Sequence, residues 1–130
     1  MESSLENKKI LVVEDDELTR EQIIRYFKDE CGCIVTEAFN GKDGLEKYRS
    51  SPDFDIVLSD LQMHPMDGID MVEKIHQEFP ESKSIFSILS TEKSLDHKAR
   101  CKNLPIKLWK LKPFEGVSVE RALKILIYDR

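Results

Sequence analysis

Acidic side chains follow two apolar runs of this chain directly, at Glu14 to Asp16 and at Asp60, and Ser90 and Lys112 follow two other runs. Carboxylates that are packed together repel one another, so such a group favours either protonation or a bound cation. Carboxylate oxygens, a backbone carbonyl and water are the ligands that Mg²⁺ prefers, and Mn²⁺ is an acceptable substitute. If the fold brings these runs together, the residues predict a magnesium site.

With a cation in place, Asp60 has the chemistry of a carboxylate nucleophile that forms an aspartyl phosphate. Phosphoryl transfer spreads negative charge over the phosphoryl oxygens, so positive groups and hydrogen-bond donors supply most of the catalysis. The ammonium of Lys112, the hydroxyl of Ser90 and a metal ion meet that demand. Taken singly, each residue has an ordinary explanation as a solvated turn, a cap or a surface lysine. Their joint occurrence after apolar runs favours the chemical interpretation.

The elements that would position these residues alternate along the chain. Short apolar, β-branched runs predict five strands, at residues 10–13, 33–38, 55–59, 85–89 and 106–111. Amphipathic segments between them predict helices, at residues 17–29, 41–49, 71–79, 92–104 and about 119–126. Gly32 is placed to end the first helix and Asn40 to cap the second. The segment 92–104 has only a thin apolar stripe, so its helix is the weakest of the five.

Strands separated by helices of this length predict an α/β fold, with a five-stranded parallel sheet, right-handed crossovers and helices on both faces. The ligand site of such a sheet lies beyond the carboxyl ends of the strands, where the strand order switches direction. The reactive residues all follow predicted strands, so we expect them at this edge. A chain of 130 residues fits one domain.

Composition and charge exclude several classes of protein. Hydrophobic residues make up 40% and charged residues 35% of the chain, which is typical of a folded domain. The formal charge of −5 gives no net attraction to nucleic acid or an anionic membrane, so DNA binding would need another polypeptide. No apolar run approaches the roughly 20 residues that span a bilayer, and residues 1–9 are too polar for a secretory signal. We therefore expect a cytoplasmic protein.

The three cysteines are an odd number in a chain without a secretory signal. This pattern favours reduced thiols over a disulfide framework. The Cys31-x-Cys33 pair lacks a matching second pair of metal ligands. We therefore expect Cys31, Cys33 and Cys101 to be ordinary packing or surface residues.

Several motifs occur at the predicted strand ends: Ile-Leu-Val-Val-Glu-Asp-Asp at 10–16, Asp-Ile-Val-Leu-Ser-Asp at 55–60, Met-Asp-Gly at 66–68, the serine at 90 and Lys-Pro-Phe at 112–114. With the intervals between Asp60, Ser90 and Lys112, they resemble the receiver domains of two-component response regulators, of the chemotaxis-regulator type. The resemblance runs from about Lys8 to Asp129. It implies a flavodoxin-like fold of five βα units and a single receiver domain over residues 1–130, with its core at about 8–129.

The resemblance also assigns roles to the acidic residues. It implies that Glu14 and Asp15 bind Mg²⁺, directly or through water, and that Asp60 accepts the phosphoryl group and joins the metal site. Gln62, two residues after Asp60, would offer its backbone carbonyl to the ion. Asp16 would be a neighbour of the site only.

Further roles implied by the resemblance concern the response to phosphate. Ser90 would be the switch hydroxyl, and Lys112 would pair with the phosphoryl oxygens and precede a cis proline. Trp109 takes the position of an aromatic ring that moves inward when the hydroxyl moves toward phosphate, although partial burial of a tryptophan on the last strand explains it nearly as well. Gln62 and Glu92 would flank the path of an attacking water and tune hydrolysis.

Three features depart from the family pattern. His64 stands where the family usually has proline, and Pro65 comes one residue late, so the geometry of this loop is open; we expect a solvated His64 rather than a catalytic one. The segment 92–106 lacks the usual small turn before the fifth strand, so its helix is expected to be short or mobile. Lys110 takes a place that is usually apolar. His76 and His97 have no partner spacing for a metal.

The resemblance implies a signalling switch rather than a classical enzyme. A sensor histidine kinase, a phosphotransfer protein or a small acyl phosphate would supply the phosphoryl group, and a downstream protein or effector domain would read the altered surface. It leaves open whether phosphorylation drives dimerisation and whether the chain acts alone or within a longer regulator. The chain itself is expected to bind neither nucleic acid nor membrane.

Other functions agree less well with the sequence. A degenerate receiver that binds proteins without phosphorylation is the main alternative, and the altered loop and the weak helix at 92–104 favour it. A phosphohydrolase of the haloacid dehalogenase type would want a second aspartate at the position of Gln62. Flavodoxin-like nucleotide binding needs a loop that accepts phosphate after the first strand, where Glu14 and Asp15 would repel it.

Overall fold

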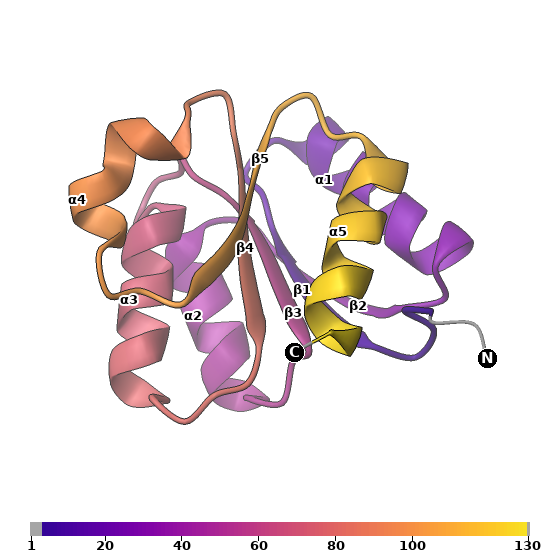
Figure 1. The fold of residues 1–130 in the computed structure, drawn as a ribbon, viewed down its shortest axis with the longest axis horizontal. Coiled ribbons are helices and arrows are strands. Elements are labelled where there is room, and N and C mark those ends of the chain that lie inside the picture. Colours follow the sequence, from indigo (N-terminus) through magenta and orange to yellow (C-terminus); the bar gives the residue numbers. More distant parts are fainter. Residues whose placement is uncertain (1–3, 130) are drawn as a thin grey trace.

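Five short strands pair in parallel into one sheet in the computed structural model, which describes residues 4–129 (Figure 1). They are β1 (Lys9–Val13), β2 (Ile34–Ala38), β3 (Ile56–Asp60), β4 (Ile85–Ser90) and β5 (Ile106–Leu111). Their order in the sheet is β2-β1-β3-β4-β5, so the direction of the connections reverses at β1 and β3. A ligand site is expected at this reversal. The predicted parallel sheet is confirmed, and each strand lies within one residue of its predicted bounds.

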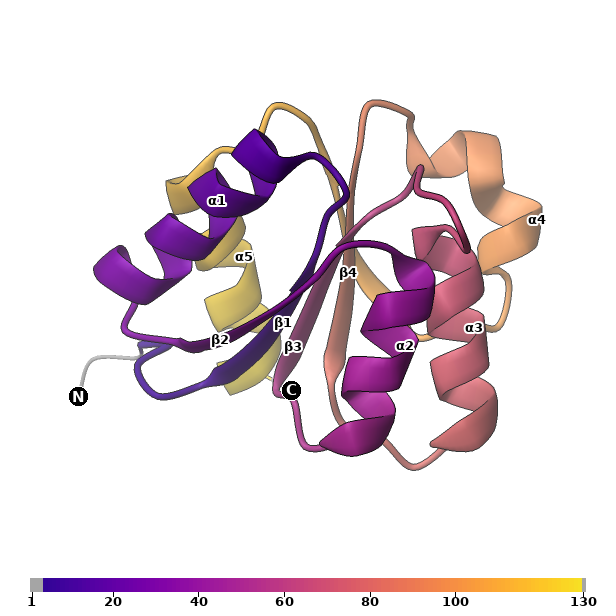
Figure 2. The same cartoon turned by 180° about the vertical axis from the view of Figure 1, so that it is seen from behind.

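Helices cover both faces of the sheet (Figures 1 and 2). One face carries α1 (Glu17–Arg25), which continues into the π-helical turn η1 (Tyr26–Glu30), and α5 (Gly116–Tyr128). The other face carries α2 (Gly41–Ser50) and α3 (Gly68–Glu78), and beside α3 lie the 3₁₀ turn η2 (Ser94–His97) and α4 (Lys98–Cys101). The α/β layering predicted from the alternating pattern is therefore confirmed.

Alternation along the strands divides the hydrophobic core between the two faces. Ile10 and Val12 of β1 pack with α1 and α5, whereas Leu11 and Val13 pack with α2 and α3. The strands β3 and β4 are fully buried, as expected of central parallel strands covered on both sides. This packing fixes the register of β1 against β3, where Val13 pairs with Ser59. The residues that follow these two strands must therefore lie side by side.

The helix ends follow the predicted signals. Asn40 caps α2 by accepting the amide of Asp43, and Gly32 adopts a φ of 70° in the turn after η1. The left-handed conformation explains why glycine stands there. Asp16 and Asp67 cap α1 and α3 in the same way as Asn40.

The segment at 92–104 forms two consecutive turns, the 3₁₀ turn η2 and the α-helical turn α4, each of four residues, so the helix is shorter than the predicted range, as the departure from the family pattern indicated. Its apolar stripe is too thin for a longer helix, since Leu95 is exposed and only Cys101 and Leu104 reach the core. Arg100 ties it to α3, with its guanidinium 2.8 Å from Asp67 Oδ2 and 3.0 Å from Asp70 Oδ1.

The two ends of the described chain meet at the amino-terminal edge of the sheet. The hydroxyl of Tyr128 donates a hydrogen bond to the backbone carbonyl of Ser4. The ammonium of Lys8 lies 5.6 Å from the centre of the Tyr128 ring. Residues 4–129 contain no helix with the length and apolar character needed to span a membrane.

Candidate functional site

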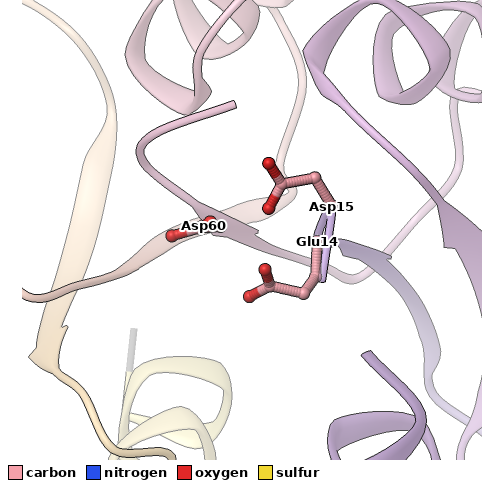
Figure 3. A group of neighbouring side chains, drawn as sticks. All are labelled: Glu14, Asp15 and Asp60. Atoms are coloured by element: carbon pink, nitrogen blue, oxygen red, sulfur yellow. The ribbon is translucent and has the colours of Figure 1, made fainter. Parts of the chain in front are cut away.

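Three carboxylates converge where β1 and β3 end (Figure 3). Glu14 and Asp15 follow β1 and Asp60 is the last residue of β3, and one oxygen of each lies within 4.8 Å of the others. Glu14 and Asp60 are buried, with 1% and 8% exposure, whereas Asp15 is exposed. The expected convergence of these side chains is confirmed, because β1 and β3 are neighbours in the sheet, whereas their roles stay a prediction.

Lys112 reaches the same site from the edge strand β5. It follows β5, and its Nζ lies 3.1 Å from Glu14 Oε1 and 3.1 Å from Asp60 Oδ1. The Lys112 backbone amide donates to the carbonyl of Ser90 at 2.8 Å, and the next peptide bond, to Pro113, is cis as predicted. The backbone amide of Leu61 also donates to Asp60 Oδ1, at 2.9 Å. These contacts hold the Asp60 carboxylate in a fixed orientation.

Burial changes the protonation of the site. It raises the pKa of Glu14 to about 7, with the charge of Asp60 adding to the rise and Lys112 opposing it. Burial also raises the pKa of Asp60, again against the opposing effect of Lys112. For Lys112, burial alone would lower the pKa, but Asp60 and Glu14 raise it above its ordinary value. The lysine is therefore cationic at neutral pH, and the carboxylates bind protons more tightly than exposed acids do.

A hard divalent cation fits this donor set. Glu14, whose pKa is raised to about 7, holds a proton near neutral pH, and a metal ion can take the place of that proton. Three carboxylate oxygens within 4.8 Å of one another, one of them on an exposed residue, suit an ion that keeps several waters. The side chain of Gln62 is exposed and donates to Glu92, and the metal role of its backbone carbonyl stays a prediction.

The two predicted switch residues meet at Glu92. Ser90 is buried, and its Oγ accepts the backbone amide of Glu92 at 2.9 Å. Trp109 is partly buried on β5, and its Nε1 donates to the backbone carbonyl of Glu92 at 2.8 Å. The hydroxyl and the indole are thus joined through one residue of the loop after β4.

Arg20 supports the acidic loop, and the sequence analysis did not identify it. Its guanidinium donates to the carbonyl of Glu14 and to the carboxylate of Glu37, each at 3.0 Å, and lies 4.5 Å from the centre of the Phe39 ring. A signal was present, because Arg20 precedes Ile23 by three residues and so falls within the apolar stripe of α1. A charged side chain in such a stripe must find a buried partner.

The remaining sequence predictions concern less reactive positions. His64 is exposed, and the His64–Pro65 bond is a second cis peptide that the sequence analysis did not foresee. The ammonium of Lys110 donates to Ser118 Oγ at 2.6 Å, which gives this lysine a partner at the start of α5. Cys31 and Cys33 are buried free thiols, and burial raises their pKa values to about 12 and about 11, as expected of packing residues.

The sequence matches the response regulator receiver domain family over residues 10–124. Chemotaxis protein CheY from Treponema pallidum is 32% identical over 120 residues, which cover 91% of this chain and 82% of that protein. Two other relatives are longer proteins. The match covers 37% of the response regulator protein VraR from Staphylococcus saprophyticus and 56% of the transcriptional regulatory protein CrdR from Helicobacter pylori.

Solved structures of chemotaxis proteins share the fold. Vibrio cholerae CheY4 superposes with a TM-score of 0.83 at 26% identity, covering 92% of this chain and 98% of that one. A chain of the CheX-CheY-BeF₃-Mg²⁺ complex from Borrelia burgdorferi superposes with a TM-score of 0.79 at 25% identity, covering 89% and 86%. In both cases the similarity extends over nearly the whole domain.

Proposed function

This chain belongs to the response regulator receiver domain family, and from that premise we propose that it is a phosphorylation switch whose acceptor is Asp60. The observation that carries the proposal is the position of Lys112, with its ammonium 3.1 Å from both Glu14 and Asp60 at the end of β3. A cation fixed beside a buried carboxylate is suited to hold a phosphoryl group against that carboxylate. Glu14, Asp15, Asp60 and the Gln62 carbonyl would hold Mg²⁺ or Mn²⁺.

In the proposed transfer, an oxygen of Asp60 bonds to phosphorus while the bond from phosphorus to the donor breaks. The electron pair of that bond leaves with the donor, either a histidine imidazole of a kinase or phosphotransfer protein or an acyl phosphate. Lys112 pairs with the phosphoryl oxygens as charge develops on them. The bound divalent ion supplies further positive charge at these oxygens. Because the chain accepts the group itself, it acts as a switch and not as a classical enzyme.

The phosphoryl group would then shift the conformation of the surface formed by α4, β5 and α5. Its oxygens offer Ser90 a new acceptor, and the contacts that Ser90 and Lys112 make only with the phosphorylated state supply the energy of the shift. Ser90 connects to Glu92 and so to Trp109 on β5, which gives the shift a route to the surface. We propose a protein target or effector domain as the reader, with the exchange of phosphoryl groups taking place in the cytoplasm.

The first experiment is intact mass spectrometry after incubation with acetyl phosphate and Mg²⁺. We expect one phosphoryl adduct, which is lost in Asp60→Asn and in the presence of a chelator. Asp53→Asn is the matched control, because Asp53 is an exposed aspartate paired with Lys9 at the opposite edge of the sheet. Trp109, the single tryptophan, should change its fluorescence in parallel with the adduct.

A receiver that binds partners without phosphorylation is the second candidate. The observations that favour it are the position of Pro65, one residue later than in the family pattern, and the shortness of the helical segment that follows β4. Absence of an adduct with acetyl phosphate and with phosphoramidate, in a folded protein that binds Mg²⁺, would support this candidate over the first.

A further inference from the structure

Glu92, in the loop after β4, is held at four of its atoms. Its Oε2 accepts the side-chain amide of Gln62, and its Oε1 accepts His97 Nε2 at 2.8 Å. Its backbone carbonyl accepts Trp109 Nε1 at 2.8 Å, and its backbone amide donates to Ser90 Oγ at 2.9 Å. A glutamate with a third of its side chain exposed would otherwise sample several rotamers.

His97 makes a second contact, with Trp109, which completes a cluster of three residues. Its imidazole stacks on the indole of Trp109, with the ring centres 5.8 Å apart and the planes at 25°. Only 16% of its side chain is exposed. Glu92, His97 and Trp109 therefore contact one another pairwise, from the loop after β4, from η2 and from β5. We call these three residues the Glu92 cluster.

We propose that His97 is a positioning residue for the phosphoryl chemistry, which holds the Glu92 carboxylate against Gln62 and ties that pair to Trp109. The inference rests on the proposed function, because it concerns the lifetime of the phosphoryl group on Asp60. Gln62 stands two residues after Asp60, and Glu92 two residues after Ser90. Since Asp60 pairs with Leu89 across β3 and β4, the Gln62–Glu92 hydrogen bond joins the loops that follow these two strands.

The position of this hydrogen bond suggests its effect on hydrolysis. In that step a water oxygen bonds to phosphorus, the bond from phosphorus to Asp60 breaks with its electron pair returning to the carboxylate, and the proton of the water leaves with the phosphate. The water must approach from the side of phosphorus opposite Asp60, past the loops that carry Gln62 and Glu92. A Gln62–Glu92 pair held closed by His97 obstructs this approach, so His97 prolongs the phosphorylated state.

The Glu92 cluster also couples hydrolysis to the output surface formed by α4, β5 and α5. If Trp109 moves inward, its Nε1 leaves the Glu92 carbonyl and its indole leaves the imidazole of His97. Glu92 then loses its link to β5, and its hydrogen bond with His97 becomes the contact that holds it against Gln62. Coupling of this kind is reciprocal, so a partner that holds Trp109 in either position also changes how tightly Glu92 is held.

The test separates the two contacts of His97. His97→Phe keeps a flat ring on Trp109 but donates no hydrogen bond, and His97→Gln keeps an amide donor but loses the ring. After phosphorylation with acetyl phosphate and removal of the donor, we expect His97→Phe to shorten the lifetime of the adduct about threefold to tenfold, as the loss of one hydrogen bond allows. His97→Gln should restore most of the lifetime.

Trp109 fluorescence of the unphosphorylated, metal-free protein reads the stack independently. His97→Gln should shift the emission to longer wavelength, because it removes the ring that covers the indole from water, and His97→Phe, which keeps a ring there, should shift it less. In a Glu92→Ala background, His97→Phe should no longer change the lifetime. His76→Phe is the matched control, because His76 lies in the last turn of α3, at the opposite edge of the sheet from Asp60.

The outcomes are distinguishable. Equal lifetimes for the wild type, His97→Phe and His97→Gln, or a lowered melting temperature without a change in lifetime, would overturn the inference and leave the proposed function intact. An effect of His97→Phe that persists in Glu92→Ala would also overturn it. No adduct even in the wild type would overturn the proposed function and the inference with it.

Discussion

Glu14 and Asp60 are placed where a carboxylate is costly to the folded state. A carboxyl group whose pKa is raised on folding stabilises the protein below its unfolded pKa, and this contribution is lost as pH rises through the folded pKa. For Glu14 this contribution to stability is lost between pH 4.5 and about pH 7. At pH 8 without metal, the site therefore opposes folding, and Lys112 and the backbone amides of Leu61 and Asp16 offset only part of the repulsion between its acids.

Asp60→Asn should stabilise the metal-free protein at pH 8. The amide keeps the volume of the carboxylate but removes one of two buried negative charges, so we expect the free energy of unfolding to rise by about 1–2 kcal/mol. At pH 5 the gain should be smaller, because Glu14 is then mostly protonated. Urea unfolding at both pH values, with chelator, measures the difference. An Asp60→Asn variant that is less stable than Asp53→Asn at pH 8 would contradict the argument.

The reactive residues of the site could be identified from sequence because each follows a strand directly. Asp60, Glu14 and Lys112 need only the rule that parallel strands present their carboxyl ends at one edge. Arg20 was not identified although its place in the apolar stripe of α1 was a signal, and the role of His97 was not identified because no local spacing encodes its partners. His97 was considered only as a metal ligand, whereas its contacts are with Glu92 and Trp109.

At the scale of elements, the start of α3 is packed directly against the end of β3, which carries Asp60. The amide of Gly68 donates to the Leu61 carbonyl at 2.8 Å. A Cβ at Gly68 would lie 2.3 Å from the backbone oxygen of Asp60 and 3.0 Å from Ser59 Oγ. Only glycine allows the helix to approach the end of β3 this closely.

Gly68→Ala should therefore destabilise the protein by about 2–4 kcal/mol, since backbone atoms must move to accept the methyl group. The same movement displaces the end of β3, so phosphorylation by acetyl phosphate should slow as well. Lys74→Ala, an exposed position on the same helix, is the control and should change stability by less than about 0.5 kcal/mol. Denaturant unfolding checks the first effect and intact mass the second. Equal stability of the two variants would show that α3 can shift freely at Gly68.

The strands were predictable because apolar runs of four to six residues stand between clear turn signals. The helix at 92–104 was predicted too long, since a thin apolar stripe among charged residues does not specify where a helix ends. Arg100 compensates for the thin stripe by a tertiary contact with Asp67 and Asp70, which a local pattern cannot show. The His64–Pro65 cis bond likewise depends on the loop around it and not on the dipeptide.

At the scale of the whole molecule, a metal ion that binds only the folded site stabilises the entire domain. At a concentration 100 times its dissociation constant, such an ion adds about 2.7 kcal/mol. We expect Mg²⁺ at this level to raise the melting temperature by about 5–10 °C at pH 8. At pH 5.5 the rise should be much smaller, because protons on Glu14 compete with the ion.

Thermal unfolding at constant ionic strength measures this effect, with Asp15→Asn as the variant that should respond weakly. Potassium at the same ionic strength is the control for general screening. A response to Mg²⁺ that is equal at both pH values would mean that the ion binds elsewhere.

The contact between Tyr128 and Ser4 also has a consequence for engineering. Because both ends of the described chain lie at the amino-terminal edge, a short linker from Asp129 to Ser4 would close the chain into a loop without crossing the proposed phosphorylation site. New ends could then be opened in the turn between α3 and β4, which lies at the same edge. A circular permutant of this kind should keep the acceptor edge intact and carry a fluorescent reporter away from it.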